Sequence, residues 1–126
     1  MVIDTGIFID YLRAGNKDTT TLQNLPDNTD VFVSSVTLYE LYMGATSTEK
    51  WKDVELLTNG LPVLPISKQV AERAGMIYQE LRRSNEMIEF RDIFIAALAM
   101  VHGLPVLSRN RKHFRRIKGL MLVKGT

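Results

Sequence analysis

The sequence predicts an α/β fold in which helices cover both faces of an open parallel sheet of five strands. Short apolar runs recur along the chain without alternating with polar residues, as expected of strands that are buried on both faces. Segments with helical spacing separate these runs, and this strand–helix–strand order is typical of a doubly wound sheet. The 126 residues contain no internal repeat or linker, so we expect a single domain over residues 1–126.

Five apolar runs are predicted to be the strands, at residues 2–3, 31–33, 61–64, 105–107 and 120–123. The third run contains Pro62, which favours a sheet edge because proline cannot donate to a ladder. Helices are expected between the strands, at residues 7–12, 35–44, 67–81 and 93–101. In the third helix, which Ser67 caps, apolar side chains recur at helical spacing from Val70 to Leu81. The fourth is apolar on all sides, which indicates burial, and Gly103 is its expected stop.

Composition excludes several classes of protein. The 45% apolar and 24% charged residues are ordinary globular values, which excludes disordered and fibrous proteins. No apolar run approaches 18 residues and an acid stands at position 4, so we expect neither a membrane helix nor a signal peptide, and a cytoplasmic location. Zero cysteines exclude disulfides and thiolate metal sites. With only His102 and His113 as histidines, any metal site must rest mainly on oxygen ligands.

The net charge of +2 hides an asymmetry between the two parts of the chain. Residues 109–126 hold seven of the sixteen basic groups and no acid. Residues 1–108 therefore hold nine basic and fourteen acidic groups, a net charge of −5. Such a basic end indicates a polyanionic partner, and the alternative is a solvated basic surface.

Asp4 ends the first predicted strand, Glu40 lies one or two turns beyond the second, and Asp92 sits at the start of the apolar helix. These acids can therefore reach the sheet edge where doubly wound folds bind ligands. Each also has a structural explanation: Asp4 can cap the next helix, Thr37 and Glu40 fit a capping box, and Asp92 complements a helix dipole. Asp92 precedes a nine-residue apolar run, however, so its carboxylate needs a partner. A divalent cation shared with Asp4 and Glu40 would supply the missing charge, and an oxygen-only site suits Mg²⁺ or Mn²⁺. Acids beside a basic segment suit phosphodiester hydrolysis.

Four segments in order carry a resemblance to a known family: Val2-Ile3-Asp4-Thr5 with Ile9-Asp10; Ser35-Val36-Thr37-Leu38-Tyr39-Glu40-Leu41 with Gly44; residues 91–99; and residues 103–110 with His113-Phe114, Ile117 and Gly119-Leu120. At this spacing the chain resembles the PIN-domain family, and within it the VapC-type ribonuclease toxins of prokaryotic toxin–antitoxin pairs. The resemblance covers nearly the whole length of the chain.

The resemblance implies a PIN-like parallel sheet of five strands and a metal-dependent endoribonuclease toxin of a type II pair. It implies that Asp4, Glu40 and Asp92 are the catalytic and metal-binding acids, that the cofactor is Mg²⁺ (with Mn²⁺ as the alternative), and that the partners are RNA, a VapB-like antitoxin and a second copy in a homodimer. The family often has a fourth acid shortly after the fourth strand, where this chain has the neutral Asn110. One firmly held ion is therefore expected, with a second recruited by RNA phosphate.

Other polar residues are expected to support these acids. Thr5, Ser108 and Asn110 are expected to orient carboxylates, water or substrate. Contact with the RNA backbone or with the antitoxin is expected of five basic residues, Arg109, Arg111, Lys112, Arg115 and Arg116. His113 has no nearby acid in a triad-like arrangement, so we expect it to pack against a helix or lie at the surface.

Two other functions stay open at this point. The neutral Asn110 leaves room for a catalytically weak PIN domain that binds RNA or antitoxin without efficient cleavage. A phosphatase of the haloacid-dehalogenase type also begins with a strand that ends in aspartate, but it needs a second Asp two residues later, where this chain has Gly6. No P-loop or GxGxxG motif supports nucleotide binding of those kinds.

Overall fold

The computed structural model of the protein describes residues 1–124. Its strands are β1 (Val2–Ile3), β2 (Val33–Ser34), β3 (Val63–Leu64) and β4 (Val106–Leu107). Its helices are α1 (Thr5–Arg13), α2 (Ser35–Met43), α3 (Thr48–Thr58), α4 (Lys68–Arg83), α5 (Phe90–Val101) and α6 (Arg111–Phe114), with a 3-10 turn η1 (Lys17–Thr19). None of the helices in this range has the length and apolar character needed to cross a membrane.

The strands are parallel and pair in two small sheets, β1 with β4 and β2 with β3. Single bridges extend this pairing: Val2 bridges Phe32 just before β2, and Val106 bridges Leu122 in the predicted fifth strand. The five predicted segments thus lie in the order β3, β2, β1, β4 and Leu122. The regular strands are only two residues long, so a continuous five-stranded sheet is not confirmed.

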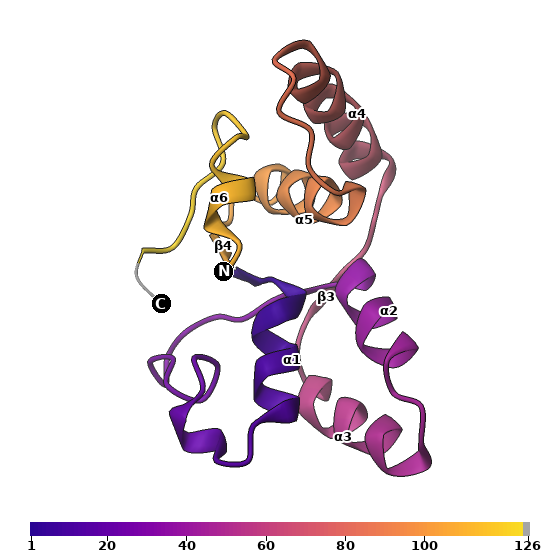
Figure 1. The fold of residues 1–126 in the computed structure, drawn as a ribbon, viewed down its shortest axis with the longest axis vertical. Coiled ribbons are helices and arrows are strands. Elements are labelled where there is room, and N and C mark those ends of the chain that lie inside the picture. The colour runs from indigo at the N-terminus through magenta and orange to yellow at the C-terminus, as the bar shows by residue number, and fades with distance from the viewer. Residues whose placement is uncertain (125–126) are drawn as a thin grey trace.

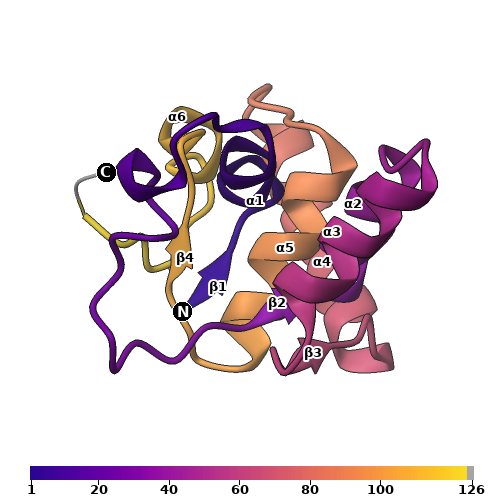
Figure 2. The ribbon, with the colours of Figure 1, turned by 90° about the horizontal axis from the view of Figure 1, so that it is seen from below.

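Helices lie on both sides of these strands, as the apolar runs predict. Figure 1 shows α4, α5 and α6 on one side and α1, α2 and α3 on the other, and Figure 2 shows the same layers from below. Alternate strand residues face opposite sides of the pleat. Val2 and Val106 accordingly join the core beneath α4 and α5, whereas Ile3 and Leu107 join the core beneath α1 and α2. Burial on both faces explains why the sequences of β1, β2 and β4 do not alternate, whereas β3 at the edge is only partly buried.

The helix ends follow local sequence signals in several places. Ser67 caps α4 by accepting from the Val70 amide at 3.2 Å. Gly103 follows α5 with φ of +66°, a left-handed conformation that glycine adopts without strain. Helix α3 was not expected from the sequence, because Val54 is its only fully buried side chain and its remaining surface is largely polar.

Candidate functional site

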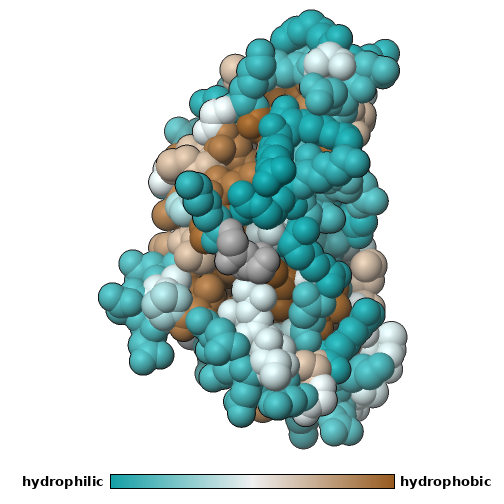
Figure 3. Space-filling model, turned by 60° about the vertical axis from the view of Figure 1, so that its left-hand side comes forward, coloured by the Kyte–Doolittle hydropathy of each residue, from teal (hydrophilic) through white to brown (hydrophobic). Residues whose placement is uncertain are grey.

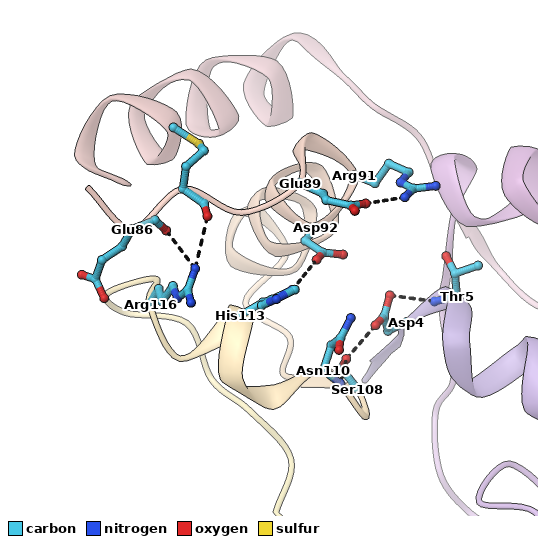
Figure 4. A network of polar contacts seen from close by, with 11 residues as sticks. Asp4, Thr5, Glu86, Glu89, Arg91, Asp92, Ser108, Asn110, His113 and Arg116 are labelled. Atoms are coloured by element: carbon cyan, nitrogen blue, oxygen red, sulfur yellow. Dashed lines mark hydrogen bonds and ion pairs between the residues drawn. The ribbon is translucent and has the colours of Figure 1, made fainter. Parts of the chain in front are cut away.

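The carboxyl ends of β1 and β4 lie side by side because these two strands pair in parallel. Asp4 follows β1, and Ser108 and Asn110 follow β4. The first turn of α5 brings Asp92 to the same edge (Figure 4). Figure 4 shows the carboxylates of Asp4 and Asp92 pointing into a shared space that the Asn110 side chain also borders. The predicted convergence at the sheet edge is therefore present in the structure.

Asp4 is both a helix cap and part of this polar cluster. One carboxylate oxygen accepts from the Thr5 amide at 2.8 Å, and the other accepts from the Ser108 hydroxyl at 2.6 Å. Asp4 is 6% exposed, and this burial raises the pKa of its carboxyl in spite of both hydrogen bonds. The negative charge of Glu40 raises the pKa further. The capping explanation is thus correct but incomplete, because capping a helix does not explain why Asp4 is buried close to a second carboxylate.

Asp92 is also buried and faces another negative charge. Burial is the main cause that raises the pKa of Asp92, and the carboxylate of Asp4 is the second. Its protein partner is His113, whose Nδ1 lies 3.3 Å from Asp92 Oδ2. The sequence interpretation of His113 as a residue without a nearby acid was wrong, since α6 folds back onto the first turn of α5. A histidine on the helix that follows the Ser108–Asn110 turn was the available signal.

Glu40 lies within α2 rather than at its start. Ser34 caps this helix by accepting from the amides of Val36 and Thr37, so the capping-box interpretation of Glu40 was wrong. Its first oxygen accepts from the Thr5 hydroxyl at 2.7 Å, and its second accepts from Arg91 at 2.8 Å. Both carboxylate oxygens of Glu40 therefore have a protein donor.

Arg91 is a further residue of the site that the sequence interpretation missed. It stands directly before Asp92 and bridges two acids, with one guanidinium nitrogen on Glu40 and the other on Glu89. These contacts raise the pKa of Arg91 and lower that of the exposed Glu89. Its position beside Asp92 in the motif was the only sequence signal.

The predicted supporting residues hold the acids in place. Thr5 contacts Glu40 and also lies 2.9 Å from the buried Thr37 hydroxyl, which fixes its own orientation. The Ser108 hydroxyl donates to Asp4 and accepts from the backbone N–H of Asn110 at 2.8 Å. Because a hydroxyl can donate and accept at once, Ser108 couples the turn after β4 to Asp4.

The basic residues divide into two groups. Arg109 passes over Gly6, where a Cβ would come within 2.8 Å of the guanidinium, and pairs with Asp10 at 2.6 Å. Two others donate to backbone carbonyls: Arg111 to Val123, and Arg116 to Met87 at 3.2 Å. Lys112 and Arg115 are exposed. Figure 3, which brings the α6 side forward, shows that hydrophilic side chains cover much of this face, with apolar ones visible between them.

A divalent cation needs several oxygen donors around one point. Within residues 1–124, no group of three acidic or histidine side chains could hold a metal ion together. The predicted set of Asp4, Glu40 and Asp92 is thus not preassembled, since Arg91 and Thr5 hold both oxygens of Glu40. Mg²⁺ is commonly held by one or two carboxylates, with water and substrate phosphate completing its shell. Asp4 and Asp92 fit such a site by their chemistry, because a cation would relieve the repulsion between two buried carboxylates.

Comparisons with known proteins show the family of the chain. The profile of the PIN domain matches residues 1–120. Ribonuclease VapC2 of Haemophilus influenzae is 35% identical over 92 residues, which covers 70% of each protein. The structure of VapBC-1 from nontypeable Haemophilus influenzae has a TM-score of 0.82 at 26% identity, over 98% of this chain and 96% of that one. A toxin–antitoxin complex from Klebsiella pneumoniae has a TM-score of 0.76 at 26% identity, over 95% and 94%. The chain therefore belongs to the PIN-domain family, and within it to the VapC proteins.

Proposed function

We propose that this protein is the endoribonuclease toxin of a type II toxin–antitoxin pair and that it hydrolyses RNA phosphodiester bonds with the help of a divalent cation. The observation that carries the proposal is the pair of buried carboxylates, Asp4 and Asp92, whose pKa values are both raised at the edge where β1 and β4 end. The ribonuclease names of VapC relatives and the toxin–antitoxin complex among the similar structures support it. On this proposal residues 1–126 act as one PIN domain with one continuous five-stranded sheet.

We assign Asp4 and Asp92 as the first ligands of the cation, Mg²⁺ or alternatively Mn²⁺, and Glu40 as the third catalytic acid and third ligand. Such a cation supplies positive charge that polarises a phosphodiester and makes water more acidic. The chain positions the acids around it: Ser108 orients Asp4, and Thr5 orients Glu40. His113 orients Asp92 from α6, and Asn110 borders the same space without adding charge (Figure 4).

The proposed partners are RNA, a VapB-like antitoxin and a second copy of the chain. Lys112 and Arg115 are exposed beside the site and suit the RNA backbone. Arg109, Arg111 and Arg116 contact the protein itself, so they would meet RNA or antitoxin only through their remaining donors. A cytoplasmic location suits an RNA substrate and a chain without cysteine.

The proposal is tested by cleavage of RNA with and without EDTA. We expect wild-type protein to cleave only when Mg²⁺ or Mn²⁺ is present, and Asp92→Asn to lose cleavage while keeping its far-UV circular dichroism spectrum. Asp27→Asn is the matched control, because Asp27 is an exposed acid in a loop. Cleavage that continues in EDTA, or an active Asp92→Asn variant, would contradict the proposed mechanism.

A second candidate is a PIN domain that binds RNA or antitoxin and cleaves poorly. The neutral Asn110 beside Asp4 favours it, because an amide adds no negative charge to the cation site. The same assay separates the candidates: RNA that is bound but stays intact at saturating Mn²⁺ supports the binding module. Restored cleavage in Asn110→Asp would then identify position 110 as the cause.

A further inference from the structure

Arg91 places a positive charge directly on one of the three acids of the site. Its guanidinium donates to Glu40 Oε2 at 2.8 Å, while Thr5 donates to Oε1 at 2.7 Å. The Glu40 side chain is 11% exposed, whereas that of Arg91 is 39% exposed. The contact therefore joins a nearly buried carboxylate to a cation that has a free path to solvent.

This ion pair occupies the acid that a divalent cation would need as its third ligand. A positive group within hydrogen-bond distance of Oε2 repels a second positive charge at that oxygen. This is consistent with the lack of any three-residue metal set within residues 1–124, although Asp4 and Asp92 face each other nearby. Among the described residues, neither of the other two carboxylates is hydrogen-bonded to an arginine or lysine: Asp4 accepts from Ser108 and Thr5, and Asp92 from His113.

We propose that Arg91 is a built-in competitor of the divalent cation for Glu40. Arg91 holds Glu40 in the metal-free protein, and binding of the cation releases the guanidinium from Oε2. Arg91 is thus a positioning residue that acts through Glu40 and sets the cation affinity of the site. This inference rests on the proposed metal-dependent function.

The structure also provides a place for the released guanidinium. Glu89, two residues earlier at the start of α5, already contacts the second nitrogen of Arg91 and is exposed. When Arg91 leaves Glu40, it can keep this partner at the rim of the site. Release therefore breaks one of two ion pairs instead of both, and partly exposed ion pairs are weak enough for a cation to displace.

Arg109 offers a matched comparison within the same chain. It is also a partly exposed arginine paired with an acid, but its partner is Asp10 on α1, outside the three acids. Its positive charge still reaches Asp4, where it lowers the pKa. Removing Arg109 takes a positive charge away from the neighbourhood of the site without freeing Glu40.

The test measures Mg²⁺ and Mn²⁺ affinity by isothermal titration calorimetry in the absence of RNA. We expect Arg91→Ala to bind the cation about fivefold more tightly than wild type, which is the order of magnitude of a partly exposed ion pair. Arg109→Ala removes a charge that reaches Asp4 but contacts none of the three acids, so its gain in affinity should be smaller than that of Arg91→Ala and should persist in a Glu40→Gln background. In the same Glu40→Gln background, Arg91→Ala is expected to change the affinity by less than about twofold.

The outcomes separate this inference from the proposed function. If wild type binds no divalent cation, both fail. If wild type binds the cation but Arg91→Ala leaves the affinity unchanged or weaker, only the inference fails. The same holds if the gain persists in Glu40→Gln, because the effect of Arg91 would then not pass through Glu40.

A direct measurement keeps the test decisive should Arg91→Ala fold poorly. The ¹⁵N resonance of the Arg91 Nε group is expected to shift when Mg²⁺ is added to wild type, because the guanidinium changes its partner. A crystal structure of the Mn²⁺-bound protein in which Arg91 still donates to Glu40 Oε2 would overturn the proposal.

Discussion

Replacing Asp92 by Asn removes one of two facing, buried carboxylates and keeps the shape of the side chain. Burial and the charge of Asp4 raise the pKa of Asp92, so its ionised form destabilises the metal-free fold at neutral pH. Each unit of such a shift corresponds to about 1.4 kcal/mol. An amide avoids this cost and can still accept from His113. We therefore expect metal-free Asp92→Asn to unfold at a temperature equal to or above that of metal-free wild type.

The gain in Tm on adding Mg²⁺ should be larger for wild type than for Asp92→Asn. A ligand at a hundredfold excess over its Kd stabilises the folded state by about 2.7 kcal/mol. The unfolding entropy of a 126-residue chain is about 0.26 kcal/mol/K. Wild type should therefore gain about 10 °C in Tm, while Asp92→Asn, with one of its ligands neutralised, should gain less than about 2 °C.

Differential scanning calorimetry in EDTA or in about 10 mM Mg²⁺, a saturating excess for a weak site, makes the comparison. Asp27→Asn controls for the loss of one exposed carboxylate and should show the full wild-type gain. An identical Mg²⁺ response in wild type and Asp92→Asn would refute the assignment of Asp92 as a ligand. Unfolding of the metal-free variant well below wild type would refute the argument from buried charge.

Three further predictions concern neighbouring groups. Because the folded-state pKa values of Asp4 and Asp92 are raised, the folded protein binds protons that the unfolded chain has released. The two ionised acids should thus destabilise the fold fully above their folded-state pKa values, and this effect should fade toward pH 4. When the pH is lowered from 7 to 5, urea denaturation in EDTA should show that the free energy of unfolding of wild type rises relative to that of Asp92→Asn. An equal change in both proteins contradicts this. Replacing Lys112 and Arg115 by Ala should flatten the log–log salt dependence of RNA binding by about 0.7 for each phosphate that is no longer neutralised, and an unchanged slope in filter binding would remove them from the RNA surface. Ser108→Ala leaves Asp4 without one donor and the next turn without an acceptor, so the free energy of unfolding should fall by about 1–3 kcal/mol in urea denaturation; a change below about 0.5 kcal/mol would contradict the role of this bond.

The sequence predicted the elements that have strong local signals. The α4 periodicity, the all-apolar α5 and the positions of β1, β2 and β4 follow from burial patterns that the structure contains. Helix α3 was not predicted, because Val54 is its only fully buried side chain and its apolar stripe is too weak to recognise. Helix α6 has only four residues, which is about one turn and too short for a periodic pattern.

The sequence allowed the acids of the site to be predicted but not the side chains that contact them. Asp4 could be placed because it ends a strand of a parallel sheet, and Asp92 because it stands in the first turn of the apolar helix α5. The contact between Glu40 and Arg91 joins residues 51 positions apart and depends on how α5 packs beside α2. The capping-box interpretation failed because Ser34 and Thr37 are both competent caps, and the end of β2 decides between them.

The pairing of β1 with β4 has a consequence for when the protein becomes active. The Ser108 hydroxyl that holds Asp4 lies 104 positions after it in the chain. At a synthesis rate of about 5–20 residues per second, Asp4 is made roughly 5–20 s before this partner exists. A ribosome-bound chain that stops short of β4 lacks the strand that pairs with β1 on one side and the hydroxyl that holds Asp4, so its acid cluster is incomplete. On the proposed function, the messenger RNA that encodes the protein is safe from its own unfinished product.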